Sequence, residues 1–250
     1  MWYNKTVIPQ PLHQQQRERA VSMSNTKTSR NLFIAILALV LTVASFTSCS
    51  GNGEKEFEEG MKSYKAEQYE TAFKLFEKGA DCGHAGARTY LGMCYALGRG
   101  VERNDAKGVE LIREAAEQGY AEAQEKLGLC YQEGVRIEKD YAEAAKWFRE
   151  AAEQGNPEAH LSLGFCYLKG RGVVEDEAEA FRWMKKCTEL SDLPPDIAAA
   201  AEINLGILYL RGAGVKRNRE EAFRHFKKAA KQNPAMVQEM CDLLWPESVP

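Results

Sequence analysis

The sequence lacks most of the residue patterns that mark catalytic, metal and nucleotide sites. It holds only four histidines, none spaced as an i, i+4 pair, and its seven cysteines do not form two closely spaced pairs. Zinc sites generally present such pairs, so no zinc site is expected. No glycine-rich phosphate loop follows a predicted strand, since no strand is predicted anywhere. We therefore expect no cofactor, no metal and no enzymatic activity.

An excess of basic charge is also missing. The chain carries 33 basic and 36 acidic residues, a net charge of −3. Without the five basic residues and the single acidic residue that precede Cys49, 28 bases and 35 acids remain, a net charge of −7. Nucleic-acid-binding proteins carry a basic patch or track. The acidic balance therefore argues against nucleic acid as a partner.

What the sequence does contain is a repeat. Leu-Gly pairs recur with spacings of 36, 36 and 42 residues, at Gly92, Gly128, Gly164 and Gly206. Each is followed by a tyrosine three positions on, a glycine six positions on, and a helix-capping residue twelve positions on: Asn104, Asp140, Asp176 and Asn218. Each unit therefore predicts a short helix, a glycine turn and a capped second helix. Units of this length cannot bury their apolar faces alone and stack as a solenoid.

The motif L-G-x-x-Y-x-x-G-x-G-V, a cap, then K-A-x-x-W-F-x-x-A-A-x-x-G is similar to the Sel-1-like repeat family, which is related to the tetratricopeptide repeat. The resemblance implies an all-α, right-handed α/α solenoid that binds other proteins. It covers four repeats, at 84–119, 120–155, 156–196 and 197–234.

Two departures from the repeat pattern are visible. Arg136 replaces the second turn glycine of its unit, and Ser191–Ala198 carries a six-residue insertion whose two prolines predict a loop at Ser191–Asp196.

Helical segments are also predicted on both sides of these repeats. Residues 55–83 have tetratricopeptide-like spacing and are expected to form a first helix pair. Residues 235–250 are expected to form a capping helix, Ala235–Trp245, and a tail, because the open apolar end of a solenoid needs a cover.

The N-terminal region has the features of an export signal. Residues 1–22 are interpreted as a non-native or mis-assigned extension, because Met23 offers a second start followed by the positive charge typical of a signal peptide. Residues 23–48 are predicted to be that signal peptide. Its uncharged run, Leu32–Phe46, has fifteen residues, which is shorter than the roughly 17–25 residues of a membrane-spanning helix.

The run ends in Phe46-Thr47-Ser48-Cys49, which resembles a bacterial lipobox. In such proteins the cysteine is acylated and becomes the first residue of the mature chain, and several acyl chains give stable anchoring. We therefore expect lipid attachment at Cys49, a tether at 49–54, and a location in the bacterial cell envelope, at the outer membrane or the periplasmic face. Ordinary secretion and an uncleaved anchor helix stay open as alternatives.

The cysteines of the repeats are predicted to be core residues. One helix position holds cysteine in three units and Leu208 in the fourth: Cys94, Cys130 and Cys166. Equivalent residues of stacked helices lie about 10 Å apart, beyond the roughly 7 Å Cα separation that a disulfide spans. A pair among Cys82, Cys187 and Cys241 stays open.

The family also has a cysteine-rich secreted branch with disulfides between successive helix pairs. The positions that match those bridges here are Ala152 and His160, so the activities proposed for that branch are not expected to carry over. Cys82-Gly83-His84 is the remaining metal or thiol–imidazole candidate, and it has no second ligand pair.

A recognition surface is predicted on the first helices, which line the concave face by analogy with tetratricopeptide repeats. The C-terminal half of this surface is apolar: Leu161, Phe165, Leu168, Ile203, Ile207 and Leu210. A peptide or helix of a partner protein can bind such a groove, although packing against neighbouring helices is an open alternative. The predicted function is an envelope-anchored interaction scaffold or adaptor. Binding or hydrolysis of a cell-wall-related ligand and a purely structural envelope role are the alternatives.

Overall fold

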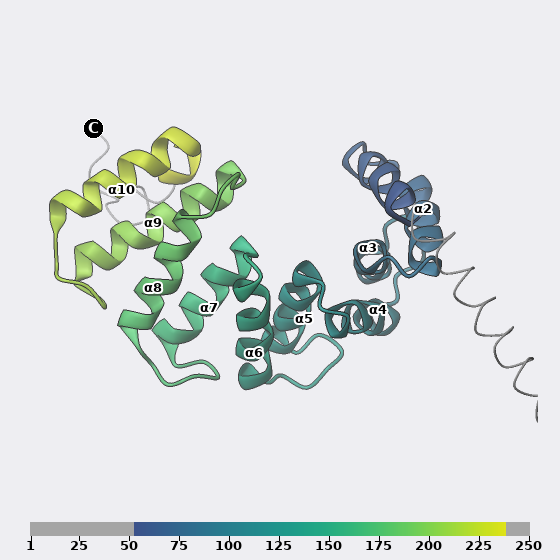
Figure 1. Ribbon diagram of the computed structural model, residues 1–250, viewed down its shortest axis with the longest axis horizontal. Coiled ribbons are helices and arrows are strands. Elements are labelled where there is room, and N and C mark those ends of the chain that lie inside the picture. The colour runs from purple at the N-terminus through teal and green to yellow at the C-terminus, as the bar shows by residue number, and fades with distance from the viewer. Residues whose placement is uncertain (1–52, 239–250) are drawn as a thin grey trace, which may run out of the picture. The chain divides into compact units, whose positions relative to one another are not determined.

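The computed structural model describes residues 53–238, and the described chain is helical without strands, as predicted (Figure 1). Residues 53–65 form a first helical segment. The helices that follow it within the described range are α2 (Tyr69–Asp81), α3 (Ala85–Leu97), α4 (Asp105–Glu117), α5 (Ala121–Glu133), α6 (Tyr141–Glu153), α7 (Pro157–Lys169), α8 (Glu177–Thr188), α9 (Pro195–Arg211) and α10 (Arg219–Gln232). None of the described helices is both long enough and apolar enough to cross a membrane.

The predictions for the N-terminal region fall largely outside this range. The extension at 1–22, the signal peptide at 23–48 and Cys49 lie outside the described residues. The predicted tether at 49–54 overlaps the described range at its last two residues, Gly53 and Glu54, and both are helical.

Successive helices pack as pairs, and each pair packs on the next one along the chain (Figure 1). The pairs α3–α4, α5–α6, α7–α8 and α9–α10 correspond to the predicted first and second helices of the four repeat units. Contacts between α4 and α5, α6 and α7, and α8 and α9 join neighbouring units. Short-range packing of this kind is what defines a solenoid.

The second helices begin at the predicted capping residues. The Asp140 carboxylate accepts hydrogen bonds from the N–H groups of Ala142 and Glu143, at 2.8 and 3.1 Å. The side chains of Asn104, Asp176 and Asn218 likewise accept from backbone N–H groups in the first turn of α4, α8 and α10. These bonds satisfy donors that a helix leaves open at its start.

The second turn glycine, present in three of the four units, allows a close approach to the preceding unit. Gly172 has a φ of 72°, and a Cβ there would lie 1.8 Å from the carbonyl oxygen of Tyr141. Arg136, at the equivalent position one unit earlier, keeps a left-handed φ of 57°. Its Nε lies 3.3 Å from a carboxylate oxygen of Asp105, at the start of α4. The substitution therefore preserves the turn conformation and adds a side-chain contact to the preceding unit.

The core is divided into slices, as expected for stacked units. Five apolar clusters lie along the described residues, and each joins residues of neighbouring helices. One of them contains the fully buried Phe148 of α6 with Leu163 and Cys166 of α7. The glycine of the Leu-Gly pair lets α5 approach α6 closely, because a Cβ at Gly128 would lie 2.6 Å from the Phe148 ring.

The cysteine position shared by three units is buried or half-buried, as predicted. Its members are free thiols: Cys94, Cys130 and Cys166. Burial raises their thiol pKa values, that of Cys94 to about 11, and Leu208 is buried in the fourth unit. Cys187 is a buried free thiol and Cys82 is disulfide-bonded, so those two are not paired with each other. Cys241 lies outside the described residues.

The insertion is shorter as a loop than the sequence predicted. Residues 189–194 form an irregular connection, but Pro195 is the first residue of α9 and Asp196 the second. Proline fits the first turn of a helix, because its missing N–H would have no partner there. The loop predicted at Ser191–Asp196 was therefore wrong at its last two residues, Pro195 and Asp196, which belong to α9.

The chain beyond α10 begins as the predicted capping segment. Residues 234–238 are helical, and the Asn233 side chain accepts a hydrogen bond from the N–H of Met236 at 3.1 Å. Met236 and Val237 pack against Ala199 and Ile203 of α9. The remaining residues, 239–250, lie outside the described range.

Candidate functional site

The six residues predicted to form the apolar groove differ in accessibility. Leu161 and Ile203 are each only 8% exposed and belong to core clusters. The other four are exposed or half-buried: Phe165, Leu168, Ile207 and Leu210. These four residues of α7 and α9 are the apolar patch considered below. Its most accessible member is Phe165, with 44% of its surface exposed.

Phe165 is the exception at its repeat position. The equivalent residues each pack against an adjacent core cluster: Met93, Leu129 and Ile207. Phe165 packs against no core cluster of the described residues, and Leu161 instead joins Leu205 of α9 in the core. Because α9 follows the insertion, the exposed phenylalanine coincides with the break from the 36-residue period.

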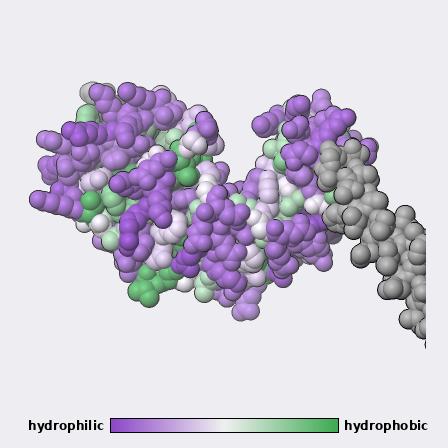
Figure 2. All heavy atoms as spheres, viewed as in Figure 1, coloured by the Kyte–Doolittle hydropathy of each residue, from purple (hydrophilic) through white to green (hydrophobic). Residues whose placement is uncertain are grey.

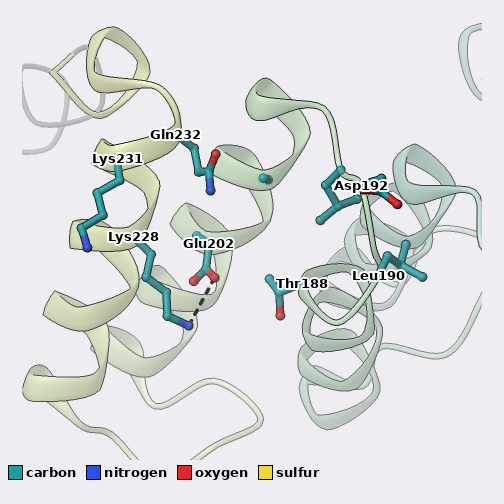
Figure 3. A pocket seen from close by; sticks show the side chains of 9 residues that line it. Thr188, Leu190, Asp192, Glu202, Lys228, Lys231 and Gln232 are labelled. Carbon is teal, nitrogen blue, oxygen red and sulfur yellow. Dashed lines mark hydrogen bonds and ion pairs between the residues drawn. The ribbon is translucent and has the colours of Figure 1, made fainter.

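Two equivalent cavities lie between successive units in the C-terminal half. One, of about 460 Å³, lies between α8, α9 and α10 (Figure 3). Its lining residues are Thr188, Leu190, Asp192, Leu193, Ala198, Glu202, Lys228, Lys231 and Gln232. The other, of about 400 Å³, lies one unit earlier between α6, α7 and α8. Its lining residues are Ala152, Glu153, Gly155, His160, Trp183, Lys186, Glu189 and Leu190.

Two polar positions face each other between the two helices of a unit, and in the third and fourth units their side chains line these cavities. These positions lie four residues before and 22 residues after the Leu-Gly glycine. The pairs in the first, second and fourth units are Arg88–Glu114 at 3.5 Å, Gln124–Glu150 at 3.2 Å and Glu202–Lys228 at 3.4 Å. Each includes one carboxylate. The third unit places His160 and Lys186 at these positions, so neither position holds a carboxylate, and the acids that line the same cavity are Glu153 and Glu189.

In the fourth unit, the carboxylate of Glu202 lines the cavity and contacts basic residues of α10. Figure 3 shows Glu202 of α9 directed toward Lys228 of α10. His225 also bonds Glu202 through Nδ1, at 2.5 Å, while its ring stacks on Tyr209 at 5.3 Å. Burial acts to raise the pKa of Glu202, but the His225 hydrogen bond and the Lys228 charge outweigh it and lower that pKa. Glu202 is therefore held ionised.

Sequence reasoning missed these inter-helix pairs. Their members are 26 residues apart, and neither position was predicted to face the other. The signal available was the recurrence of complementary side chains at two fixed positions, as in Arg88 with Glu114 and Glu202 with Lys228.

The Cys82-Gly83-His84 segment is structural. His84 Nδ1 accepts the N–H of Ala87 at 3.0 Å and thereby caps α3. Its Nε2 lies 3.0 Å from Glu54 of the first helical segment. Across residues 53–238, no group of three His, Cys, Asp or Glu side chains is arranged to hold a metal ion.

Comparison with known proteins agrees with the repeat. The Sel1 repeat family model matches residues 57–84, 85–120, 121–156, 157–192 and 199–234. The first of these matches falls on the segment described from sequence as a tetratricopeptide-like helix pair. No curated protein matches the chain.

Several solved structures are similar to this chain. A Sel1 repeat protein from Oxalobacter formigenes is 26% identical, with a TM-score of 0.60 over 74% of this chain and 86% of that one. The protein c5321, a protective antigen of uropathogenic Escherichia coli, displays an SLR fold. It is 27% identical, with a TM-score of 0.52 over 77% of this chain and 48% of its own. A putative sel1 repeat protein from Klebsiella pneumoniae, 17% identical with a TM-score of 0.52, covers 78% of this chain and 94% of its own and shares the fold.

The helical units, their capped second helices and the five family matches agree on one assignment. Sel1 repeats form helical scaffolds of a kind used for protein–protein interaction. The matched segments make up well over half of the sequence, and this chain belongs to the Sel1 repeat family.

Proposed function

We propose that this protein is an envelope-anchored interaction scaffold that binds a segment of a partner protein on the apolar patch of α7 and α9. The observation that carries the proposal is the exposure of Phe165, whose equivalents in the other units pack against the core. Exposing a phenylalanine to water costs free energy that a partner would recover on binding. Buried aromatic anchors of this kind dominate the energetics of many interfaces.

The patch has the chemistry of a peptide- or helix-binding surface. Leu168 and Ile207 are half-buried and pack against core clusters, whereas Phe165 packs against none and is 44% exposed. Lys169 and Arg211 are exposed and directly follow Leu168 and Leu210 at the ends of α7 and α9. A partner segment with apolar residues and an acidic flank would complement this arrangement.

The rest of the described surface is mostly polar. In the view of Figure 2, hydrophilic residues cover most of the face, and hydrophobic residues gather in small separate areas. A protein with a mostly polar surface attaches to a membrane more readily through a covalently bound lipid than through its own side chains. The proposed attachment residue is Cys49, supported by the uncharged run and the lipobox-like Phe46–Cys49 sequence before it.

Photo-crosslinking tests the patch. Benzoylphenylalanine is placed at position 165 in the full-length protein and irradiated in intact cells, with position 174 as the matched control. Val174 is 87% exposed in the turn after α7, so its replacement leaves the patch intact. A defined adduct from position 165 that is absent from position 174, and that Ile207→Glu removes, supports the proposal. Equal labelling at both positions would refute it.

Lipid attachment is tested separately. Wild type is expected to incorporate radiolabelled palmitate and to fractionate with membranes, whereas Cys49→Ala is expected to lose the label. Label that persists in Cys49→Ala would refute attachment at this residue without bearing on the apolar patch.

A further inference from the structure

The third repeat unit departs from the other units at the inter-helix polar pair. Arg88, Gln124 and Lys228 each face a glutamate within 3.5 Å. His160 and Lys186 occupy the same two positions one unit before Lys228 and have no such acid between them. The third unit therefore differs from the equivalent units in having no carboxylate at either of the two pair positions.

His160 lines the cavity with one ring nitrogen bonded to the backbone. His160 is only 3% exposed, and its Nδ1 lies 2.8 Å from the carbonyl oxygen of Asn156, to which it donates. Its Nε2 makes no hydrogen bond to any described residue. The ring meets Trp183 edge-on, with centroids 5.6 Å apart. Two contacts therefore fix the orientation of the His160 ring at the wall of the cavity.

Lys186 supplies a second group without an acid. Its ammonium lies 4.3 Å from the centroid of the Trp183 ring, and it forms no ion pair within residues 53–238. The neighbouring Lys185, by contrast, lies 3.8 Å from Glu189. Lys186 is exposed to solvent and lines the same cavity as the buried His160, and a cation and an imidazole that share a cavity can both interact with an anion.

We propose that the cavity between α6, α7 and α8 binds a small organic carboxylate, with the carboxylate between His160 and Lys186. The cavity of about 400 Å³ lies within the usual range of small-molecule pockets. Trp183, Leu190 and Ala152 offer apolar surface for the rest of the ligand. Glu153 and Glu189 also line the cavity and disfavour ligands with several negative charges. The site takes a monoanion with an apolar body.

Binding is coupled to proton uptake by His160. Burial, and to a lesser degree the charge of Lys186, lower the pKa of His160, so the imidazole of the empty cavity is neutral at neutral pH. The other charged groups lining the cavity are Glu153 of α6 and Glu189 at the end of α8. A bound carboxylate would favour the imidazolium and raise its pKa. Affinity therefore increases as the pH falls toward the ordinary histidine range.

The test uses benzoate as probe, benzamide as its uncharged analogue, and the full-length protein in detergent. Binding is followed by the NMR shift of the Trp183 indole N–H, assigned by its loss in Trp183→Phe. Lys186→Glu supplies the missing carboxylate from the protein itself and is expected to weaken benzoate binding about tenfold or more, as the loss of a charge-assisted hydrogen bond implies. Lys185→Glu changes the charge equally one residue away and is expected to leave binding within about twofold.

Each result bears on the proposal. Benzoate binding that weakens in Lys186→Glu and in His160→Gln, and strengthens from pH 8 to pH 6, supports it. Equal binding of benzamide, or equal loss in Lys185→Glu and Lys186→Glu, would overturn it. Binding without pH dependence would overturn the role of His160 as proton acceptor. A response only to a capped glutamate peptide, and not to benzoate, would overturn the small-molecule assignment in favour of a protein carboxylate. Thermal melts of each variant verify folding.

Discussion

The contact between Gly128 and Phe148 allows a quantitative test of how closely the units are packed. Phe148 is fully buried, so Phe148→Ala should cost about 3–5 kcal/mol in unfolding free energy. Gly128→Ala improves helix propensity by about 1 kcal/mol. It also places a Cβ 2.6 Å from the Phe148 ring, and overpacking of this kind costs about 1–3 kcal/mol. The single change at Gly128 should therefore be neutral or destabilising by up to about 2 kcal/mol.

The double variant should behave differently. Once Phe148 is alanine, the methyl group added at Gly128 enters a cavity, so Gly128→Ala should become stabilising by about 1 kcal/mol or more in that background. Urea unfolding followed by circular dichroism gives the four free energies of the cycle, and the coupling should be about 1–3 kcal/mol. A coupling below about 0.5 kcal/mol would refute the close packing of α5 on α6 that we infer from the glycine of the Leu-Gly pair. A changed urea dependence in Phe148→Ala would show instead that the units unfold separately.

Three further predictions concern single positions, each measured by chemical or thermal unfolding. Arg136→Gly should raise stability by about 1 kcal/mol, because relief of the left-handed strain outweighs an exposed contact with Asp105, and a loss would contradict this. Asp140→Ala should cost about 1 kcal/mol through loss of the α6 cap, whereas Gln68→Ala should cost little, because Gln68 makes no side-chain cap bond to α2. Glu202 has a lowered pKa in the folded protein, so its contribution is present above the ordinary glutamate pKa of about 4.3 and is lost as the pH falls through the folded value. Glu202→Gln should flatten stability in that acidic window, and an unchanged profile would count against the His225 and Lys228 contacts.

The sequence predicted those parts of the fold that depend on local chemistry repeated in phase. Asp140 and its three equivalents recur twelve residues after the Leu-Gly glycine, and a capping residue acts on the N–H groups directly next to it. The paired helices and the shared cysteine position could be predicted for the same reason, because each depends on a short sequence spacing that recurs in several units. The start of α9 was missed, because proline both ends helices and begins them, and local sequence alone does not decide between the two.

The candidate site depended on contacts between units, which the sequence does not specify. Leu161 and Phe165 both belong to the apolar face of α7, yet one is buried against Leu205 and the other is 44% exposed. Which of them becomes core depends on where α9 lies after the insertion. The His160–Lys186 pair was missed for a similar reason, because 26 residues and a turn separate its members. That neither of these two positions holds a carboxylate becomes meaningful only once the equivalent pairs are known to be in contact.

Repetition makes each unit a control for its neighbours, and both features that we propose as binding sites fall in the third unit. The exposed Phe165 and the unmatched His160–Lys186 pair both lie between residues 156 and 191, directly before the period changes from 36 to 42. The other units show a better-packed residue or a complementary pair at the same positions. Selection for stability alone would be expected to remove both, because stabilising substitutions are easy to find. The two proposed ligands would account for this difference between the third unit and its neighbours.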